Sequence, residues 1–300
     1  MKFSVYISAC LLFICTFTTN NLFAESINYQ TPFEKAQWQF SGDPFGCKIN
    51  HRVHHFGTFG LMANPGEALT LSLSADWLSL DNIQSQAAVV PPSWQAQIQQ
   101  PIATTSLNWS GAQALTQHDT NPFLEALEQG LTWQVDIATE GSGYRVSSSP
   151  VSTQTVANQF RICRQQLLPK PFSYLRRLEL QFASSSSLLS PAHEQDLYAI
   201  QRYLQADPSI IEVLIDGHAD ASGERLANLV LSKARADEVK SRLIELGVAP
   251  QIIQTRHHGN RAPVASNTDS AGRKLNRRVS VRLVKSATPP AKNSAWGALK

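Results

Sequence analysis

The chain has 300 residues, of which 42% are hydrophobic and 16% are charged, and its formal net charge is +3. This balance is typical of a folded protein and excludes a disordered one. The length suits two ordinary domains, since single cores usually stop growing near about 100–200 residues. Charge is unevenly spread: residues 25–168 hold 6 Lys and Arg against 11 Asp and Glu, whereas residues 169–288 hold 17 against 12. The change of sign supports a two-domain division.

The first 24 residues have the pattern of a secretory signal peptide. Lys2 supplies the positive start, an apolar run follows it, and Ala24 offers a cleavage point. A lipid-anchored start at Cys15 is the alternative, but it requires a small residue where the bulky Ile14 stands. We therefore expect an exported, periplasmic protein whose first domain begins near residue 25.

The exported chain keeps two cysteines, Cys47 and Cys163. In an oxidising compartment an even pair favours a disulfide over a metal site or a nucleophile. Two buried, unpaired thiols are the alternative. We predict a Cys47–Cys163 disulfide that joins the first and last segments of the amino-terminal domain.

Residues 25–168 are expected to form a mainly β domain, either a sandwich or a barrel-like fold. Period-two alternation of apolar and polar residues predicts strands at 68–74, 131–137 and 144–147. A short helix is predicted at 121–127, with Asn121 as its cap and Gly130 as its stop. Periodicity alone assigns no function to this domain.

From Pro169 onward strands and helices alternate, and residues 169–286 are expected to form an α+β sandwich. Strands are predicted at 178–182, 210–215, 252–257 and 278–283. One helix begins at Ser190, which caps it, and a longer helix ends at Gly247. The order β-α-β-α-β-β implies two helices on one face of a mixed sheet. Residues 287–300 are expected to be a flexible tail.

The second half contains a dense run of motif residues. The pattern G-H-x-D-x-x-G-x4-N-x-x-L-S-x-x-R-A starts at Gly217, and G-R-x-x-N-R-R-V starts at Gly272. Both occur in the order found in the OmpA C-terminal domain family, which residues 169–284 closely resemble. The resemblance implies a periplasmic peptidoglycan-binding module, and we expect the protein not to be an enzyme.

The residue types in this motif suit a zwitterionic ligand. Ser232 is expected to be the N-cap of the long helix, which would put Arg235 in the first turn, where free amides and the helix dipole favour an anion. The planar guanidinium of Arg235 suits a carboxylate, and Asp220 offers the opposite charge for an ammonium group. The free end of meso-diaminopimelate in Gram-negative peptidoglycan carries both groups.

The resemblance implies that Asp220 and Arg235 hold this ligand, and an ordinary surface ion pair is the alternative. Asn228 and Arg278, which also belong to the motifs, complete the predicted ligand-binding set. The Asn276–Arg278 cluster has two open interpretations: contact with the ligand, or a structural tie between the last strand and the ligand loop.

The sequence gives little support for a metal site, a catalytic site or a nucleic-acid-binding site. His218 and Asp220 form H-x-D, which can bind a metal, but no third ligand has suitable spacing. Nucleophile elbows, phosphate loops and zinc patterns are absent from the sequence. We predict no catalytic residues, no cofactor and no metal, and export together with the mild charge argues against a nucleic-acid partner.

A second set of motif residues covers the first half of the chain. It consists of Tyr29-x-Thr31-Pro32, Trp38, Pro44-Phe45-x-Cys47, His51, Phe56-Gly57, Pro65-Gly66, Val90-Pro91-Pro92-x-Trp94 and Cys163-Arg164-x-x-Leu167-Leu168-Pro169. From about Asn28 to Leu283 the chain resembles the MotY family, periplasmic accessory proteins of sodium-driven polar flagellar motors.

The MotY resemblance implies a role for each domain. The amino-terminal domain would dock onto the flagellar basal body and a MotX-like companion protein, while the carboxy-terminal domain grips peptidoglycan. Together they would support assembly of the stator complex around the rotor. A generic envelope protein that tethers another cargo to peptidoglycan is the main alternative. A peptidoglycan hydrolase is a further alternative, but it would need a catalytic site that the sequence does not offer.

Overall fold

The computed structural model describes residues 26–95, 100–139 and 141–286 of the chain. The expected signal peptide (1–24) and tail (287–300) lie outside the described residues. Within the described ranges, no helix is both long enough and apolar enough to cross a membrane.

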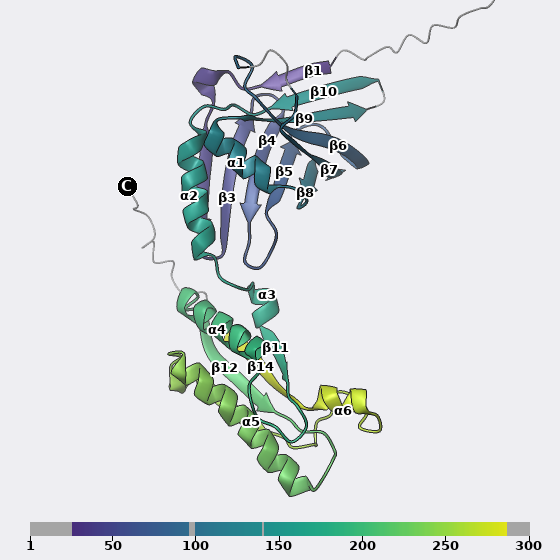
Figure 1. Cartoon of the computed structure of the whole chain (residues 1–300), viewed down its shortest axis with the longest axis vertical. Helices are drawn as coiled ribbons and strands as arrows, with labels where there is room; N and C mark the ends of the chain where they lie inside the picture. Colours follow the sequence, from purple (N-terminus) through teal and green to yellow (C-terminus); the bar gives the residue numbers. More distant parts are fainter. Residues whose placement is uncertain (1–25, 96–99, 140, 287–300) are drawn as a thin grey trace, which may run out of the picture.

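Two separate hydrophobic cores divide the chain. The first gathers buried residues from Trp38 to Cys163, and the second gathers residues from Leu168 to Leu283. Figure 1 shows the corresponding bodies one above the other, joined by a single stretch of chain. The predicted two-domain fold is therefore confirmed.

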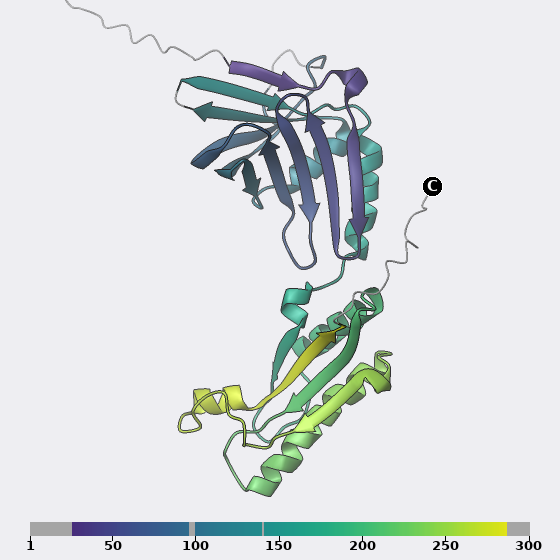
Figure 2. The same cartoon turned by 180° about the vertical axis from the view of Figure 1, so that it is seen from behind.

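The amino-terminal domain is built on one ten-stranded sheet, in the order β1-β10-β9-β6-β7-β8-β5-β4-β3-β2. Its strands are β1 (Ser26–Gln30), β2 (Trp38–Asp43), β3 (Gly46–Val53), β4 (Gly57–Ala63), β5 (Thr70–Ala75), β6 (Leu80–Val90), β7 (Ala103–Gly111), β8 (Gln113–Thr116), β9 (Thr132–Thr139) and β10 (Ser142–Ser147). β1 pairs parallel with β10, and the remaining neighbours pair antiparallel. The sheet curls into an open half-barrel (Figures 1 and 2), so the mainly β, barrel-like expectation is confirmed.

The predicted elements of this domain have counterparts in the structure. The three predicted strands correspond to β5, β9 and β10. The predicted helix is α1 (Asn121–Gln129), which ends at Gly130 with a φ of 66°. Its cap is Thr120, because Asn121 already lies within the helix.

A second helix, α2 (Thr153–Gln166), corrects the expectation of one short helix in this domain. Gln, Thr and Arg residues dominate its sequence and mask the pattern of its apolar side. The buried residues recur at helical spacing, at Val156, Ala157, Phe160 and Cys163. In Figure 1, α1 and α2 cover one face of the curled sheet.

The predicted disulfide between Cys47 and Cys163 is confirmed. Cys47 lies on β3 and Cys163 lies on α2; their Cα atoms are 6.0 Å apart, and the two residues are 116 positions apart in sequence. The bond therefore fixes the last helix of the domain to one of its first strands.

The carboxy-terminal domain has a four-stranded mixed sheet in the order β11-β14-β12-β13. Its elements are α3 (Phe172–Leu175), β11 (Arg177–Gln181), α4 (Pro191–Ala206), β12 (Ile210–Gly217), α5 (Arg225–Glu245), β13 (Ile253–His257), α6 (Ser270–Asn276) and β14 (Arg278–Lys285). β12 and β13 pair parallel, whereas β14 pairs antiparallel with β11 and β12. The apolar residues of the strands face α4 and α5 in one core, which confirms two helices on one face of a mixed sheet.

Alternation along β14 leaves a polar face on the other side of this sheet. Val279 and Val281 belong to the core that the helices cover, so Arg278, Ser280 and Arg282 point to the opposite face. The direction of Arg278 matters for the candidate site below.

Two of the three helix ends predicted from sequence in this domain agree with the structure. Ser190 caps α4: its Oγ accepts from the N–H of His193, and its own N–H donates to His193 Nδ1. Gly247, with a φ of 94°, follows the end of α5 as expected. The start of α5 is different, because the helix begins at Arg225 and not near Ser232.

The two domains touch at the β2–β3 hairpin. The N–H of Leu168 donates to the carbonyl of Pro44 at 2.9 Å, and the ring of Phe45 meets Tyr203 of α4 edge-on, with centroids 5.5 Å apart. Cys47 lies at the start of β3, within this hairpin, so the disulfide lies close to the junction.

Candidate ligand-binding site

The candidate site lies where β12 ends and the chain turns into α5. Gly217 is required there by close packing, because a Cβ at this position would clash with the carbonyl of Ser232. Gly223 has a φ of 82°, a conformation that favours glycine in the turn before α5. Gly217 therefore lets the end of β12 pack closely against α5, and Gly223 lets the chain turn into that helix.

The predicted position of Ser232 and Arg235 at a helix start was wrong. α5 begins at Arg225, so Arg235 lies about 15 Å along the helix, beyond its free amides. Ser232 Oγ donates to the carbonyl of Leu229 at 2.8 Å and accepts from the N–H of Gly259 at 2.9 Å. This serine therefore bonds back to its own helix and ties the neighbouring loop at Gly259 to the middle of that helix.

Arg235 is fully buried and holds three backbone carbonyls. Its Nε donates to Ser186 at 2.8 Å, its Nη1 to His218 at 3.0 Å, and its Nη2 to Ala183 at 2.9 Å. Burial lowers the pKa of Arg235 to about 10, and the nearby charge of Asp220 opposes this shift. The guanidinium therefore stays charged at neutral pH and joins two loops to α5.

Asp220 is also buried and already has partners. One carboxylate oxygen accepts from the N–H of Ser222 at 2.9 Å, and the other pairs with Arg277 Nη1 at 3.0 Å. Burial alone would raise the pKa of this carboxyl, but the bonds from Ser222 and Arg277 hold it below its ordinary value. Asp220 is therefore an ionised group at the edge of a cationic cluster.

Asn276 and Arg277 tie the surrounding loops together. Asn276 Oδ1 accepts from the N–H groups of Val264 and Ala265, while its Nδ2 donates to Asn267 Oδ1 at 3.0 Å. Asn267 Oδ1 also accepts from the N–H of the residue that follows Asp220. Of the two interpretations of the Asn276–Arg278 cluster, ligand contact and a structural tie, these contacts fit the structural tie. Sequence reasoning left Arg277 out of the predicted set, although it adjoins Arg278 in the same motif.

Of the four predicted ligand residues, the structure places Asp220 and Arg235 close enough for their charges to interact. Asn228 lies in the first turn of α5, on the same buried side as Arg235, and its Nδ2 has no partner within the described residues. Arg278 points to the opposite sheet face, where Nε lies 3.4 Å from Glu179 and Nη2 lies 3.3 Å from the carbonyl of Ala262. Arg277 caps the end of α6 just before β14 and reaches Asp220, whereas Arg278, the first residue of β14, does not.

His218 lies on that opposite face as well. Its ring stacks on His258 with centroids 4.7 Å apart, and His258 Nε2 lies 2.9 Å from Asp216 Oδ1. Burial lowers the pKa of His218 to about 4, and the positive charge of Arg278 adds to the effect. Across the described ranges, no three His, Cys, Asp or Glu side chains gather in a way that could hold a metal.

Comparison with known proteins identifies both domains. Residues 29–169 match the MotY N-terminal domain, and residues 181–277 match the OmpA family. Each of the two domains therefore matches one family model, the MotY N-terminal domain first and the OmpA family second. The OmpA-family part contains Asp220, Arg235 and Asn228.

Relatives with known names fall into two groups. The sodium-type flagellar protein MotY of Vibrio parahaemolyticus is 22% identical over 258 residues, covering 83% of this chain and 88% of that protein. The OmpA-family domain matches the probable lipoprotein YiaD of Escherichia coli at 38% identity over 34% of this chain, and outer membrane porin F of Pseudomonas fluorescens at 36% over 34%. These matches span 46% of the lipoprotein and 31% of the porin, less than half of each.

Among solved structures, the peptidoglycan-associated lipoprotein from Burkholderia pseudomallei is 28% identical. The likeness covers 35% of this chain and 89% of that one, with a TM-score of 0.34. This score is too low to add to the assignment made from sequence.

Proposed function

We propose that this chain is a periplasmic accessory protein of a flagellar motor that anchors the motor to peptidoglycan. In this proposal the OmpA-family domain binds the cell wall, as a binding protein and not as an enzyme. The MotY N-terminal domain docks onto the basal body and a MotX-like companion, and the two domains together support stator assembly. Export by residues 1–24, which lie outside the described residues, belongs to the same proposal.

The observation that carries the wall-binding role is the charge cluster of Asp220, Arg235 and Arg277 at the end of β12. An ionised carboxylate next to two guanidinium groups matches a ligand with an ammonium and a carboxylate on one carbon. In our proposal the ammonium of diaminopimelate takes the place of Arg277 on Asp220. The ligand carboxylate then lies against the arginines, with the unpartnered amide of Asn228 as a further donor.

In this proposal Arg235 can offer a ligand fewer hydrogen bonds than a surface arginine could. A guanidinium has five N–H donors, and backbone carbonyls take three of those on Arg235. Two therefore remain for a carboxylate once the loop that carries Asp220 moves aside. Arg278 is not part of the proposed site, because it lies on the opposite face of the sheet.

Pull-down on purified peptidoglycan sacculi tests the wall-binding site. Asp220→Ala should weaken binding about tenfold to a hundredfold, since it removes a charge-assisted partner worth about 1.5–3 kcal/mol. Asp237→Ala is a matched control on α5, because Asp237 is half-exposed and pairs only with Lys233 among the described residues. Equal sacculus binding by both variants, with both folded by circular dichroism, would overturn the site.

Motility separates the flagellar role from a generic tether. A strain that lacks the chain should swim poorly, and a chain cut after Pro169 should reach the flagellar base yet restore little swimming. Normal swimming with the truncated chain would show that wall anchoring is not its task. Normal swimming without the chain would favour another cargo.

A further inference from the structure

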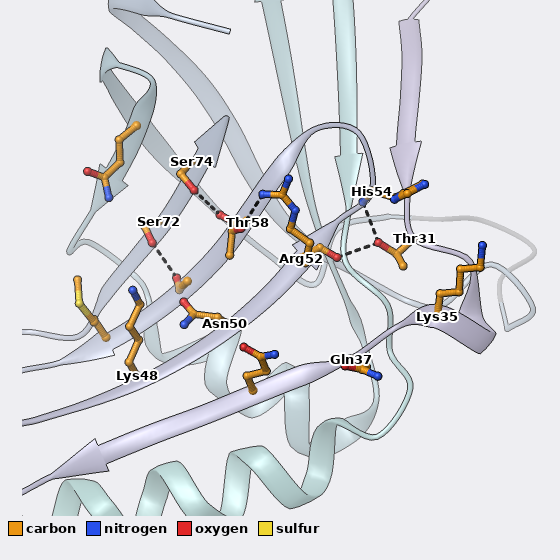
Figure 3. Close-up of a pocket in the computed structure, with 14 residues that line it drawn as sticks. Thr31, Lys35, Gln37, Lys48, Asn50, Arg52, His54, Thr58, Ser72 and Ser74 are labelled. Atoms are coloured by element: carbon orange, nitrogen blue, oxygen red, sulfur yellow. Dashed lines mark hydrogen bonds between the residues drawn. The ribbon is translucent and has the colours of Figure 1, made fainter. Parts of the chain in front are cut away.

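The curled sheet of the amino-terminal domain has an open face with a groove that no part of the wall-binding site uses. The groove has a volume of about 710 Å³ and crosses β2, β3, β4, β5 and β8. On β3, Lys48, Asn50 and Arg52 line it, whereas Ile49 belongs to the hydrophobic core and His51 is buried. The groove therefore lies on the sheet face away from α1 and α2, as Figure 3 shows.

The charge of this groove is opposite to that of its domain. Residues 25–168 hold 6 Lys and Arg against 11 Asp and Glu, yet no Asp or Glu lines the groove within the described part of the chain. Three of those six cations, Lys35, Lys48 and Arg52, line it. We call this surface the basic groove. It concentrates positive potential on one face of an acidic domain.

Two of the three cations have no counter-charge. Arg52 pairs with Asp76, outside the groove lining, whereas Lys35 and Lys48 form no ion pair with any residue that the structure describes. An ammonium group in a groove attracts an acidic partner more strongly than one on a flat surface, because the protein on either side of the groove reduces the screening of its charge by water. Charge complementarity therefore favours an anionic occupant.

The wall between the cations offers unused amide groups. Gln39 and Asn50 face each other across β2 and β3, and their side-chain amides form no hydrogen bonds with described residues. In contrast, the hydroxyls of Ser72 and Ser74 donate to backbone carbonyls of β4. A free amide presents one acceptor and two donors, the complement of a peptide group.

The spacing of the cations favours an extended chain over a compact anion. Lys48 and Arg52 are four residues apart on β3, or about 13 Å at the rise of a strand. Figure 3 places Lys35 and Lys48 toward opposite ends of the lining. No Phe, Tyr or Trp lines the groove within the described residues, and the ring of His54 already lies against His55, with centroids 3.8 Å apart, so the lining offers a base or a sugar little stacking surface. Four of the strands that the groove crosses, β3, β4, β5 and β8, are paired on both edges, so a segment that lies across them is not bound by strand addition.

We propose that the basic groove binds an extended, acidic peptide segment of a partner protein. Lys35 and Lys48 pair with carboxylates spaced along the segment, and Gln39 and Asn50 hydrogen-bond to its backbone. This surface rests on the docking role proposed above for the amino-terminal domain and gives that role a location and a partner chemistry.

Fluorescence anisotropy with the full chain tests the groove. The probe is a labelled peptide that alternates Glu and Ser, and the same peptide with Gln in place of Glu reports the contribution of charge. The Glu peptide should bind more tightly, and the Lys35→Glu, Lys48→Glu double variant should bind it at least about tenfold more weakly. Arg164→Glu is the control, because Arg164 is an exposed cation on α2, outside the groove.

The outcomes separate this proposal from its rivals and from the wall-binding proposal. Absence of binding, equal loss in Arg164→Glu, or tighter binding of polygalacturonate than of the Glu peptide would overturn the acidic-peptide assignment. Sacculus binding should be unchanged in the double variant. If the native chain fails to bind sacculi but still binds the Glu peptide through Lys35 and Lys48, the wall-binding role falls and the groove stands.

Discussion

The two domains place their polar groups in different ways. In the OmpA-family domain the guanidinium of Arg235 and the carboxylate of Asp220 are buried, and each is held by several bonds. In the MotY N-terminal domain the core is aliphatic and aromatic, a disulfide fixes its last helix, and the polar groups of the basic groove lie on an open sheet face. A site made of buried charges is tied to the stability of its domain, whereas a groove on an open face can change without loss of the fold.

The disulfide should give the largest effect and confine it to the amino-terminal domain. On the chain-entropy model, a bond that closes a loop of over a hundred residues contributes on the order of 4–5 kcal/mol, less any native strain. Cys47→Ser, Cys163→Ser and the double variant should therefore lower the unfolding temperature of that domain by similar amounts. Calorimetry should show the other domain unchanged. Two free thiols per chain on alkylation of the unreduced protein would remove the basis for this expectation.

Arg235→Ala should destabilise the OmpA-family domain by about 3–5 kcal/mol, because it leaves three buried backbone carbonyls without their charged donor. The burial of Arg235 in mid-helix corrects the sequence-based prediction that it lies in the first turn of the long helix. Arg242→Ala is the control on the same helix, where a solvated guanidinium pairs with Glu194 and Glu245 and should matter little. Urea unfolding measures both, and equal midpoints would contradict the buried network.

His218 should make the same domain sensitive to acid. Its folded pKa is lowered to about 4 from 6.5, so the unfolded state binds the proton more readily. The stability from the neutral ring is present above pH 6.5 and is lost as the pH falls toward 4, a loss on the order of 3 kcal/mol. His218→Gln should flatten this part of the pH profile measured by urea unfolding. An unchanged profile would show that His218 does not titrate with folding.

Sequence patterns predicted the parts of the structure that local chemistry determines. The cap at Ser190, the stop at Gly247 and the alternation along β14 all depend on near neighbours, and each agrees with the structure. The start of α5 was missed because Ser232 is a good cap by type, while its real partners are Leu229 and the distant Gly259.

The candidate site could be predicted only in part, for a similar reason. The motifs correctly drew attention to Asp220 and Arg235, but arginine is rarely buried, and nothing local signals that Arg235 is. Arg277 gained its role through a contact 57 positions away in sequence, which one sequence without its fold does not reveal. The sequence did not reveal the basic groove for the same reason, since Lys35 lines one surface with Lys48 and Arg52 only in the folded domain.

The central claim is that the Asp220 cluster recognises an ammonium and a carboxylate on one carbon, and calorimetric titration with two peptides tests it most directly. One is a stem tripeptide that ends in meso-diaminopimelate, and the other carries lysine there, which keeps the ammonium and lacks the carboxylate. The native chain should bind the first peptide and bind the second at least about tenfold more weakly, and Asp220→Asn should lose the first. Equal binding of the two peptides by the native chain, or undiminished binding by Asp220→Asn, would contradict the account.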